Sequence, residues 1–511
     1  MNNNNNETME NKKFSVKYYV LLPLVLLLTG FLFCIPTEWF HINVYNDAGE
    51  FIGLTVTQQR VIALFVFAAL MWIFEIIPNW TTSLMVIVLA LLTVSNKGIG
   101  FLTHLDVGAD GKPLMTGLEG TFVDYKSIMA SMADPVVMLF LGGFVLAIMA
   151  EKYGLDVTLA RYLLKPFGTK PRMVLLGFLL VISIFSMFMS NTATAAMMLA
   201  FLAPVLAVLP KDDKGKIGLA LSIPVAANIG GIGTLIGTPP NATAAGALES
   251  AGLSVTFGEW AMRMIPYVVV MILIAWVVLF VMFPFKSDKV VLELPKNKRE
   301  KDWKSIAVWI VFIGTILLWA TESLTKINSN VVALIPLGVL TALGIFTKDD
   351  ITKINWTVLW LVAGGFALGT CLQKTGLAAV LIKAIPFGSM SVVLVFIVAG
   401  LVCYFLSNFI SNSATAALLI PILIAVASGL TGSENAGAFA SMGGTQAMIS
   451  FVAVCASIAM LFPISTPPNA IASSTGLVET KDMTKVGLIM GAIGFVLAYF
   501  WLTVLFPFTA A

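Results

Sequence analysis

Two short polar motifs, each present twice, carry the side chains in this sequence that can recognise a small anion. Ser190-Asn191-Thr192 and Ser411-Asn412-Ser413 interrupt long apolar stretches, and they supply hydroxyl and amide groups that both donate and accept hydrogen bonds. Thr238-Pro-Pro-Asn-Ala242 and Thr466-Pro-Pro-Asn-Ala470 each break an apolar helix, because proline lacks the amide hydrogen and clashes with the preceding turn. The sequence therefore predicts two hairpin tips and two broken helices.

Each break leaves backbone groups without their helical partners. The freed carbonyl groups suit a cation such as Na⁺. The half-helix that starts after the prolines offers unpaired N–H groups and a positive dipole end, which suits a carboxylate. One Ser-Asn motif with one Thr-Pro-Pro-Asn motif makes a half-site, and two facing half-sites suit an anion with two charged ends.

Each motif on its own also has a structural interpretation. A single Ser-Asn-Thr in a membrane helix usually holds helices together, and a single Pro-Pro usually marks a kink. The pairing of all four motifs favours binding instead. Glu75 and Glu322 stand at the ends of apolar stretches, where we expect a structural cap or a domain contact ahead of a functional role. Because neither His nor buried Lys accompanies the motif serines, an enzyme is disfavoured.

The motifs recur in the same order at a nearly constant distance along the chain. Gly142-Gly143-Phe144 returns as Gly364-Gly365-Phe366 after 222 residues, and Ser190-Asn191 returns after 221 residues. The Thr-Pro-Pro-Asn motif returns after 228 residues. We interpret the chain as a duplication, with one repeat at 57–250 and the other at 304–478.

Composition determines the solvent in which these repeats fold. Of 511 residues, 59% are hydrophobic and 11% are charged, whereas soluble chains carry about 25% charged residues. The sequence therefore predicts an all-α polytopic membrane protein with the lipid bilayer as its solvent. A net charge of +3 without a large basic face excludes nucleic acid as a partner. Two His and four Cys at no metal-ligand spacing predict no cofactor, leaving Na⁺ as a coupling ion.

Lys and Arg residues distinguish the two faces of the membrane. They concentrate in 152–172, 211–216 and 286–304, whereas 37–56 and 429–446 contain none. By the positive-inside rule the first three segments are cytoplasmic and the other two lie outside. This assignment predicts a protein of the plasma (inner) membrane with a cytoplasmic N-terminus and an outer C-terminus.

The same assignment orients the two hairpins. The stretch 173–209 enters and leaves at the cytoplasmic face, whereas 391–430 enters and leaves at the outer face. Two similar segments that approach from opposite faces predict inverted repeats. Inverted repeats with interrupted helices are typical of secondary transporters, whose binding site lies near the midplane.

The predicted organisation follows the chain from one end to the other. It begins with a cytoplasmic tail at 1–17 and a first span and outer loop at 18–56. Repeat 1 follows at 57–250, with hairpin 173–209 and broken helix 217–252, and a linking span and basic cytoplasmic loop at 251–303 leads to the second repeat. Repeat 2 occupies 304–478, with hairpin 391–430 and broken helix 447–477, and a last span occupies 479–511.

These motifs resemble those of a known carrier family. The paired Ser-Asn tips, each followed by a Thr-Pro-Pro-Asn break, closely resemble the divalent anion/sodium symporter family over nearly the whole chain from about Thr57. That family comprises di- and tricarboxylate and sulfate carriers and related exchangers. The resemblance implies about eleven spans plus two re-entrant helical hairpins, a homodimer, and an elevator-type movement of a transport domain against a scaffold domain.

The resemblance also implies site residues, position by position. The substrate-binding residues would be Ser190, Asn191, Thr192, Thr238, Ser411, Asn412, Ser413, Thr466 and Pro467. A first Na⁺ site would comprise Ser186, Ser190, Asn191 and Gly237. A second would comprise Ser407, Ile410 through its carbonyl, Asn412 and Ser465.

The second tip departs from the family pattern. Sodium-coupled members commonly read Thr-Glu-Phe-x-Ser-Asn-Thr there, whereas this chain reads Ser407-Asn408-Phe409-Ile410-Ser411-Asn412-Ser413. The loss of the acid favours dicarboxylate exchange with weak or no sodium dependence. We expect a carrier of C4-type dicarboxylates such as succinate, malate, fumarate or 2-oxoglutarate. The alternatives are a Na⁺-coupled dicarboxylate symporter, a citrate or sulfate carrier, an anion channel and a membrane-embedded enzyme.

Overall fold

The computed structural model describes residues 17–40, 54–103, 105–108, 111–117, 120–290, 302–384 and 390–508. Three predicted segments lie wholly or largely outside the described residues, namely the Asn-rich tail, the outer loop at 37–56 and the basic loop at 286–304. His41 and His104 also lie outside them.

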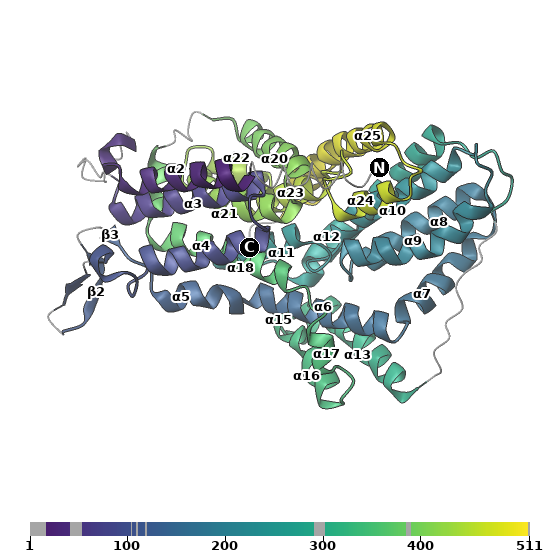
Figure 1. The fold of residues 1–511 in the computed structure, drawn as a ribbon, viewed down its shortest axis with the longest axis horizontal. Coiled ribbons are helices and arrows are strands. Elements are labelled where there is room, and N and C mark those ends of the chain that lie inside the picture. The colour runs from purple at the N-terminus through teal and green to yellow at the C-terminus, as the bar shows by residue number, and fades with distance from the viewer. Residues whose placement is uncertain are drawn as a thin grey trace. The chain divides into compact units, whose positions relative to one another are not determined.

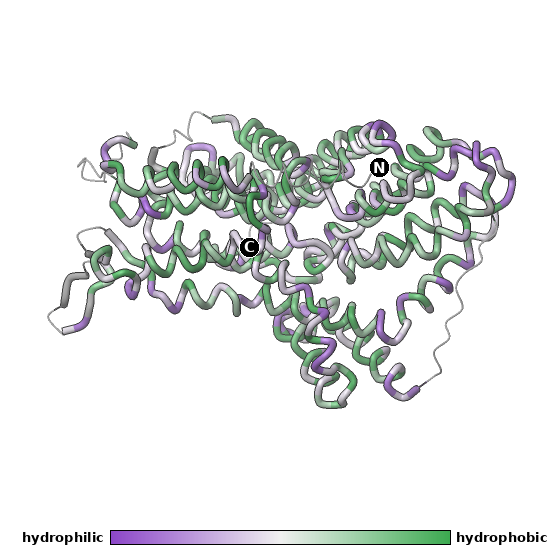
Figure 2. The backbone as a smooth tube through the Cα atoms, in the orientation of Figure 1, coloured by the Kyte–Doolittle hydropathy of each residue, from purple (hydrophilic) through white to green (hydrophobic). Residues whose placement is uncertain are grey.

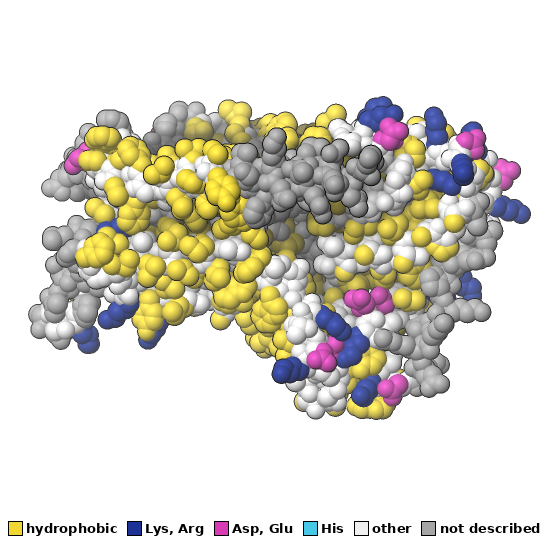
Figure 3. Space-filling model, in the orientation of Figure 1, with side chains coloured by type: hydrophobic (Ala, Val, Ile, Leu, Met, Phe, Trp, Pro, Cys, Tyr) yellow, Lys and Arg dark blue, Asp and Glu magenta, His cyan; other side chains and the backbone are white. Residues whose placement is uncertain are grey.

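The described part of the chain is mostly helical, as the composition predicts (Figure 1). Within it, eight helices are long and apolar enough to cross a membrane, and shorter apolar helices accompany them. Figure 2 shows hydrophobic residues along the helices and polar residues mainly at their ends. In Figure 3 hydrophobic side chains cover the outward helix faces, and Val281 of α12 (Phe257–Met282) is 67% exposed. Such faces require a lipid environment.

The chain divides into two compact units. Unit 1 contains Met1–Asp134, Thr357–Val395 and Ser413–Ala440, and unit 2 contains Pro135–Trp356, Phe396–Asn412 and Ser441–Ala511. The main elements of unit 1 are α2 (Leu22–Cys34), α3 (Val56–Phe74), α4 (Asn79–Thr93), β1 (Leu105–Val107), β2 (Pro113–Gly117), β3 (Gly120–Thr121), α5 (Tyr125–Met129), α18 (Trp356–Lys374), α19 (Leu377–Ala384), α21 (Asn412–Thr431) and α22 (Ala436–Ser441).

Unit 2 contains the remaining helices. They are α6 (Pro135–Lys152), α7 (Leu155–Leu164), α8 (Pro171–Ser186), α9 (Asn191–Val208), α10 (Gly215–Gly231), α11 (Pro239–Ser250), α12, α13 (Trp303–Ala320), α14 (Glu322–Thr325), α15 (Ser329–Val332), α16 (Leu334–Ala342), α17 (Lys348–Ile351), α20 (Val392–Phe409), α23 (Gly444–Ser457), α24 (Pro467–Ser474) and α25 (Thr480–Phe500).

One small sheet adds strands to the predicted all-α fold. Strand β2 pairs antiparallel with both β1 and β3, and Thr116 lies opposite Thr121. Gly111 and Gly120 have φ angles of 72° and 115°, which glycine adopts without strain. The sheet lies between α4 and α5, in a polar segment where the apolar pattern predicts no element.

Local sequence signals account for where several helices begin. Thr55 before α3 and Thr256 before α12 each form a capping box with the residue three positions later. Pro239 and Pro467 occupy the first helical position of α11 and α24, where a missing amide hydrogen has no cost. The Thr-Pro-Pro-Asn motifs therefore start helices as well as interrupting longer ones.

The repeated glycine motif makes the same kind of close helix contact in both units. A Cβ added at Gly142 of α6 would lie 2.0 Å from the carbonyl oxygen of Ala333. One added at Gly364 of α18 would lie 2.4 Å from Cβ of Ser83. In both places the first glycine of the repeated Gly-Gly-Phe allows the backbones to approach, which supports the interpretation of the chain as a duplication.

An ion pair at Asp350 holds the end of α6 to α17. Lys152 pairs with Asp350 and also donates to Ile345 O at 3.1 Å. Thr347 donates to Asp350 Oδ2 through its backbone N at 2.9 Å and through its hydroxyl at 2.8 Å. Burial raises the pKa of Asp350, but the hydrogen bonds from Lys152, Thr347 and Lys353 outweigh it and hold the pKa well below its usual range.

We expect Asp350→Asn to lower the free energy of unfolding by about 1–3 kcal/mol, because the Lys152 ammonium loses its counterion. A carboxyl with a depressed pKa stabilises the fold above its unfolded pKa of about 3.9 and loses this contribution as the pH falls through the lower folded value. The loss should therefore be the same from pH 5 to pH 8. Thermal unfolding in detergent measures it, with the exposed Asp349→Asn as control. Equal stability of the two variants would contradict the assignment.

Candidate functional site

The first hairpin tip joins α8 to α9 at Ser190. The hydroxyl of Ser190 caps α9 by accepting from Ala193 N at 3.2 Å. At the end of α8, Ser186 is fully buried and donates to Ala227 O of α10 at 2.7 Å. The tip is therefore fixed against the broken helix by a side chain that the sequence assigns to a cation site.

Asn191 completes the first tip. Its side-chain amide lies 2.6 Å from Ser186 Oγ, and its donors and acceptors match when Nδ2 faces that oxygen. In this orientation Nδ2 also donates to Gly237 O at 3.1 Å and faces Ala227 O at 3.3 Å. Asn191 thus connects the hairpin tip to both ends of the break between α10 and α11.

The second tip repeats this arrangement. Ser407 at the end of α20 is fully buried, lies 2.8 Å from Oδ1 of Asn412 and donates to Ala456 O of α23 at 2.9 Å. The same residue types thus meet in both halves, a serine with an asparagine and with a carbonyl of the facing helix, although Asn191 presents Nδ2 to its serine and Asn412 presents Oδ1. Unit 2 contains all four of these side chains.

The last residue of each Thr-Pro-Pro-Asn motif closes its own break. Asn241 Nδ2 lies 3.0 Å from Gly231 O, 3.2 Å from Ile232 O and 2.7 Å from Thr234 O. Asn469 Nδ2 likewise donates to Met460 O at 3.0 Å and to Phe462 O at 2.9 Å. Several of the carbonyls that the sequence leaves bare for a cation are therefore bound by an asparagine of the chain itself. Sequence reasoning missed this role, although the invariant motif spacing in both repeats was a signal for it.

The break in the first half is too close-packed for any side chain at Gly237. An added Cβ there would lie 2.4 Å from Gly231 O and 2.9 Å from Ser186 O. One added at Gly231 would lie 3.0 Å from Gly237 O. The backbone oxygens of Gly231, Gly237 and Ser186 thus converge around this break, and oxygen is the ligand that a hard cation such as Na⁺ requires.

The two halves also contact each other. Helix α24 packs on α9 and α10, and α11 packs on α23. Asn228 of α10 crosses between the halves: its Nδ2 donates to Thr466 Oγ1 at 3.1 Å and to Asn469 Oδ1 at 3.3 Å. No pattern in the sequence indicates a role for this residue, because Asn228 belongs to none of the repeated motifs.

The hydrogen bonds that Asn228 makes to the other half have no counterpart in the opposite direction. Ala227 and Ala456 hold equivalent places, but the residue after Ala456 is Ser457, whose hydroxyl donates to Ala453 O of its own helix at 3.0 Å. Asn228 is 1% exposed, and its Oδ1 has no hydrogen-bond partner among the described residues. One half of the site thus carries a polar bridge that the other half lacks.

We expect Asn228→Ala to raise the KM for substrate about fivefold or more, because Thr466 and Asn469 lose a donor that holds them, at about 1–3 kcal/mol. Initial uptake rates over a range of substrate concentrations measure the effect. Ser457→Ala is the matched control, since its hydroxyl bonds within its own helix, and it should leave KM unchanged. Equal KM values for the two variants would show that Asn228 does not contribute to substrate binding.

The structure places eight of the nine predicted substrate residues in unit 2, and Ser413 begins a segment of unit 1. Thr192 and Pro467 are exposed, whereas Thr238 and Thr466 are buried. The Thr466 hydroxyl donates to Asn469 Oδ1 at 2.9 Å and accepts from Asn469 N at 3.3 Å, in addition to the bond from Asn228. It therefore orders the start of α24.

The residue that replaces the family acid has a structural role. Asn408 is fully buried, donates to Tyr404 O at 2.8 Å and accepts from Leu461 N at 2.9 Å. Its backbone oxygen accepts from Ser465 Oγ at 2.9 Å. Asn408 therefore joins the second tip to the break between α23 and α24 and leaves the Ser407–Asn412 contact intact.

Glu75 and Glu322 follow two equivalent tryptophans. Trp72 Nε1 donates to Asn79 O at 3.2 Å, and Trp319 Nε1 donates to Ser329 O at 3.0 Å. Glu75 ends α3 in a left-handed conformation with φ 45°. Glu322 differs, because it is 8% exposed and its Oε2 has no hydrogen-bond partner among the described residues.

Comparisons with known proteins agree with these features. Residues 50–506 match the family model of the sodium:sulfate symporter transmembrane region. A sodium-dependent dicarboxylate transporter of Staphylococcus saprophyticus is 28% identical over 524 aligned residues, which cover 93% of this chain and 90% of the relative. An uncharacterized transporter of Haemophilus influenzae is 30% identical over 412 residues, or 76% of this chain and 85% of the relative.

A solved structure shares the fold. The crystal structure of the YdaH transporter of Alcanivorax borkumensis aligns with a TM-score of 0.56 at 14% identity, and it covers 84% of this chain and all of that one. At this identity the likeness concerns the fold alone.

Proposed function

Because the chain belongs to the sodium:sulfate symporter family, which is the divalent anion/sodium symporter family, we propose that it carries C4-type dicarboxylates across the plasma membrane by an elevator-like mechanism. The chain is a membrane transporter and not an enzyme. Succinate, malate, fumarate and 2-oxoglutarate are the proposed substrates, and a homodimer is the proposed assembly. The predicted boundaries of the two repeats and the cytoplasmic N-terminus belong to the same proposal.

The observation that carries the proposal is the matched pair of tips. In each, a buried serine contacts an asparagine and a carbonyl of the facing helix, and a helix starts at the tip itself, at Asn191 or Asn412. Each tip then offers one carboxylate hydroxyls and helix-start N–H groups, and the second tip can add Nδ2 of Asn412, whose Oδ1 faces Ser407. Two such tips fit a substrate with a carboxylate at each end, and the dicarboxylate transporter among the relatives supports this substrate class.

The candidate site supplies no Lys or Arg among the proposed binding residues, so the charge of a dianion must be offset by dipoles or bound cations. The oxygens around Gly237 and Ser186 fit Na⁺, and with Ser190 and Asn191 they form the proposed first cation site. Ser407, Asn412, Ser465 and the Ile410 carbonyl form the proposed second one. A cation there would lower the electrostatic cost of bringing a carboxylate to the tip.

We propose exchange as the mode of transport, since the second tip has lost the acid found in sodium-coupled members. In an exchanger the carrier crosses readily only when loaded, and an ion gradient is not required. Sodium-coupled symport is the second candidate. It is favoured by the sodium-dependent relative and by the contacts at Ser407, which match those at Ser186. A citrate or sulfate carrier is the alternative for substrate.

Internal succinate should accelerate uptake of labelled external succinate several-fold, whereas replacing Na⁺ with K⁺ or choline should change little. Purified protein in liposomes, with and without internal substrate and with and without a sodium gradient, measures both effects. Excess lactate should compete far less than malate, because a monocarboxylate leaves one tip unsatisfied. Uptake into empty liposomes that requires an inward sodium gradient would establish symport instead, and equal competition by lactate would contradict the two-ended site.

A further inference from the structure

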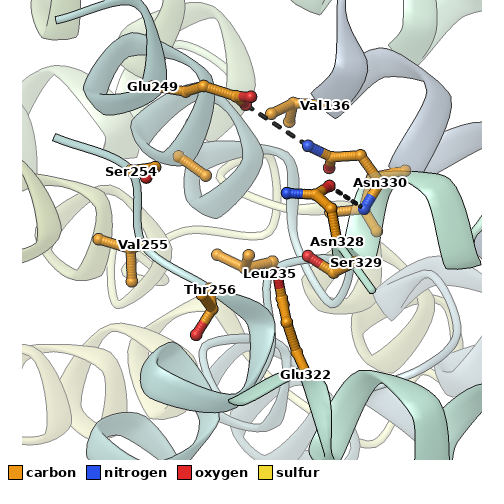
Figure 4. Close-up of a pocket in the computed structure, with 12 residues that line it drawn as sticks. Val136, Leu235, Glu249, Ser254, Val255, Thr256, Glu322, Asn328, Ser329 and Asn330 are labelled. Carbon is orange, nitrogen blue, oxygen red and sulfur yellow. Dashed lines mark hydrogen bonds between the residues drawn. The ribbon is translucent and has the colours of Figure 1, made fainter. Parts of the chain in front are cut away.

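A second polar cavity lies in unit 2, at the end of α11 opposite the candidate site. It has a volume of about 40 Å³, which accommodates an ion with one or two waters at about 10–15 Å³ each. Its polar lining comes from α11, from the loop before α12 and from the segment 322–330. Figure 4 shows Glu249 and Asn330 facing each other and Glu322 rising from below toward Leu235.

Two carboxylates dominate the charge of this cavity. Glu249 is exposed at the mouth, where its Oε2 lies 3.5 Å from Asn330 Nδ2. Glu322 is buried, and its negative charge is close enough to act on Glu249. The lining residues include neither Lys nor Arg. Thr256, which also lines the cavity, caps α12 and donates its backbone N to Glu259 Oε2 at 3.0 Å.

The Oε2 atom of Glu322 has no hydrogen-bond partner among the described residues, although the side chain lines the cavity. A buried carboxylate without a partner is costly unless a cation or a proton neutralises it. A cation in the cavity neutralises the charge of Glu322 and is also attracted by the carboxylate of Glu249.

We propose that this cavity binds a small monovalent cation through Glu322, with Glu249 and the neighbouring amide and hydroxyl oxygens completing its coordination. Of the two carboxylates that line the cavity, only that of Glu322 is buried with an oxygen that lacks a partner among the described residues, so a single positive charge is sufficient to neutralise it. A divalent metal is disfavoured, because no three His, Cys, Asp or Glu groups come together in the described part of the chain. Glu249 also lies in the last turn of α11, where the helix dipole favours positive charge.

The site is separate from the cation sites proposed at the tips. Those depend on Ser186 and Ser407, whereas this cavity contains neither residue. Helix α11 begins at the candidate substrate site and ends at Ser250, the residue after Glu249. A cation at Glu322 would therefore hold the far end of the helix whose first turn carries the Thr-Pro-Pro-Asn motif.

Thermal unfolding of the full-length protein in detergent tests the proposal. The experiment uses a Ser186→Ala/Ser407→Ala background, so that sodium binding at the tips does not contribute. In this background, replacing choline with NaCl should raise the unfolding temperature by a few degrees, as ligand linkage requires. Adding Glu322→Gln should abolish that shift and should itself raise stability in choline, because the uncompensated charge is gone.

Glu434→Gln removes an exposed acid of the same type and should leave the sodium shift intact. Binding of labelled sodium should fall by one ion per chain in Glu322→Gln and be unchanged in Glu434→Gln. A persistent sodium shift in Glu322→Gln, or a loss of stability in choline, would overturn the proposal. Stabilisation of the background by acid alone, with none by sodium or potassium, would assign a proton to the cavity and overturn it as well. None of these outcomes depends on transport, so the substrate proposal can fail independently.

Discussion

Alanine at Asn191 or at Asn412 is expected to lower succinate uptake about 100-fold or more while the protein still folds. Each asparagine is the group through which its tip contacts both a buried serine and the proposed substrate. Losing one partner of a buried hydrogen bond costs about 1–3 kcal/mol, and a loss at the upper end corresponds to about two orders of magnitude. Because two tips hold one dianion, intact contacts at one tip should not rescue the other.

Uptake into proteoliposomes measures this effect, and size-exclusion chromatography with thermal unfolding verifies folding. Asn435→Ala is a suitable control, since Asn435 donates to Met390 O within unit 1 and is not one of the proposed binding residues. Near-normal uptake by either tip variant, with normal protein levels, would refute the two-tip site.

Gly237→Ala is expected to abolish transport by a different route. The new methyl group would lie 2.4 Å from Gly231 O and 2.9 Å from Ser186 O, so the backbone at the first tip must move. That movement separates Asn191 from Gly237 O and fills the point at which the oxygens converge. We expect uptake to fall at least tenfold, and sodium binding at the first proposed cation site to be lost.

The control for this prediction is Gly314→Ala in α13, where a Cβ meets nothing within 4 Å. It should transport normally, because alanine is also the better helix former. Equilibrium sodium binding separates an occluded cation site from general misfolding. Retained uptake and retained sodium binding in Gly237→Ala would show that no cation uses this place.

The apolar stretches and proline motifs predicted the positions of the helices well, because burial in lipid and the geometry of proline act on each segment locally. The hairpin predicted at 173–209 became α8 and α9, and the broken helix predicted at 217–252 became α10 and α11. Apolar length determines which segments are helical in lipid, and the two Pro-Pro pairs mark where the second half of each broken helix begins. The membrane carrier family, predicted from the doubled motifs, is confirmed by the family match.

Contacts between distant segments were beyond sequence reasoning. Asn228 donates a hydrogen bond to Asn469, which lies 241 residues later in the sequence, and no periodic pattern predicts such a pair. Proline breaks correctly predicted freed carbonyls, but the chain supplies Asn241 to bind three of them. The sequence-based preference for a structural role at Glu322 also missed its unpaired oxygen, since burial of one atom depends on three segments that fold together.

The hydrogen bonds of Asn228 to Thr466 and Asn469 make the two ends of the proposed pocket chemically different. If both halves were equivalent, a substrate with unlike ends would have two equally good poses, one the end-to-end reverse of the other. With Asn228 on one side and a Ser457 hydroxyl that bonds within its own helix on the other, the two sides differ in hydrogen-bonding capacity. L-malate, whose hydroxyl group lies next to only one of its carboxylates, would then prefer one of the two poses, so a single departure from internal symmetry sets the orientation of the substrate.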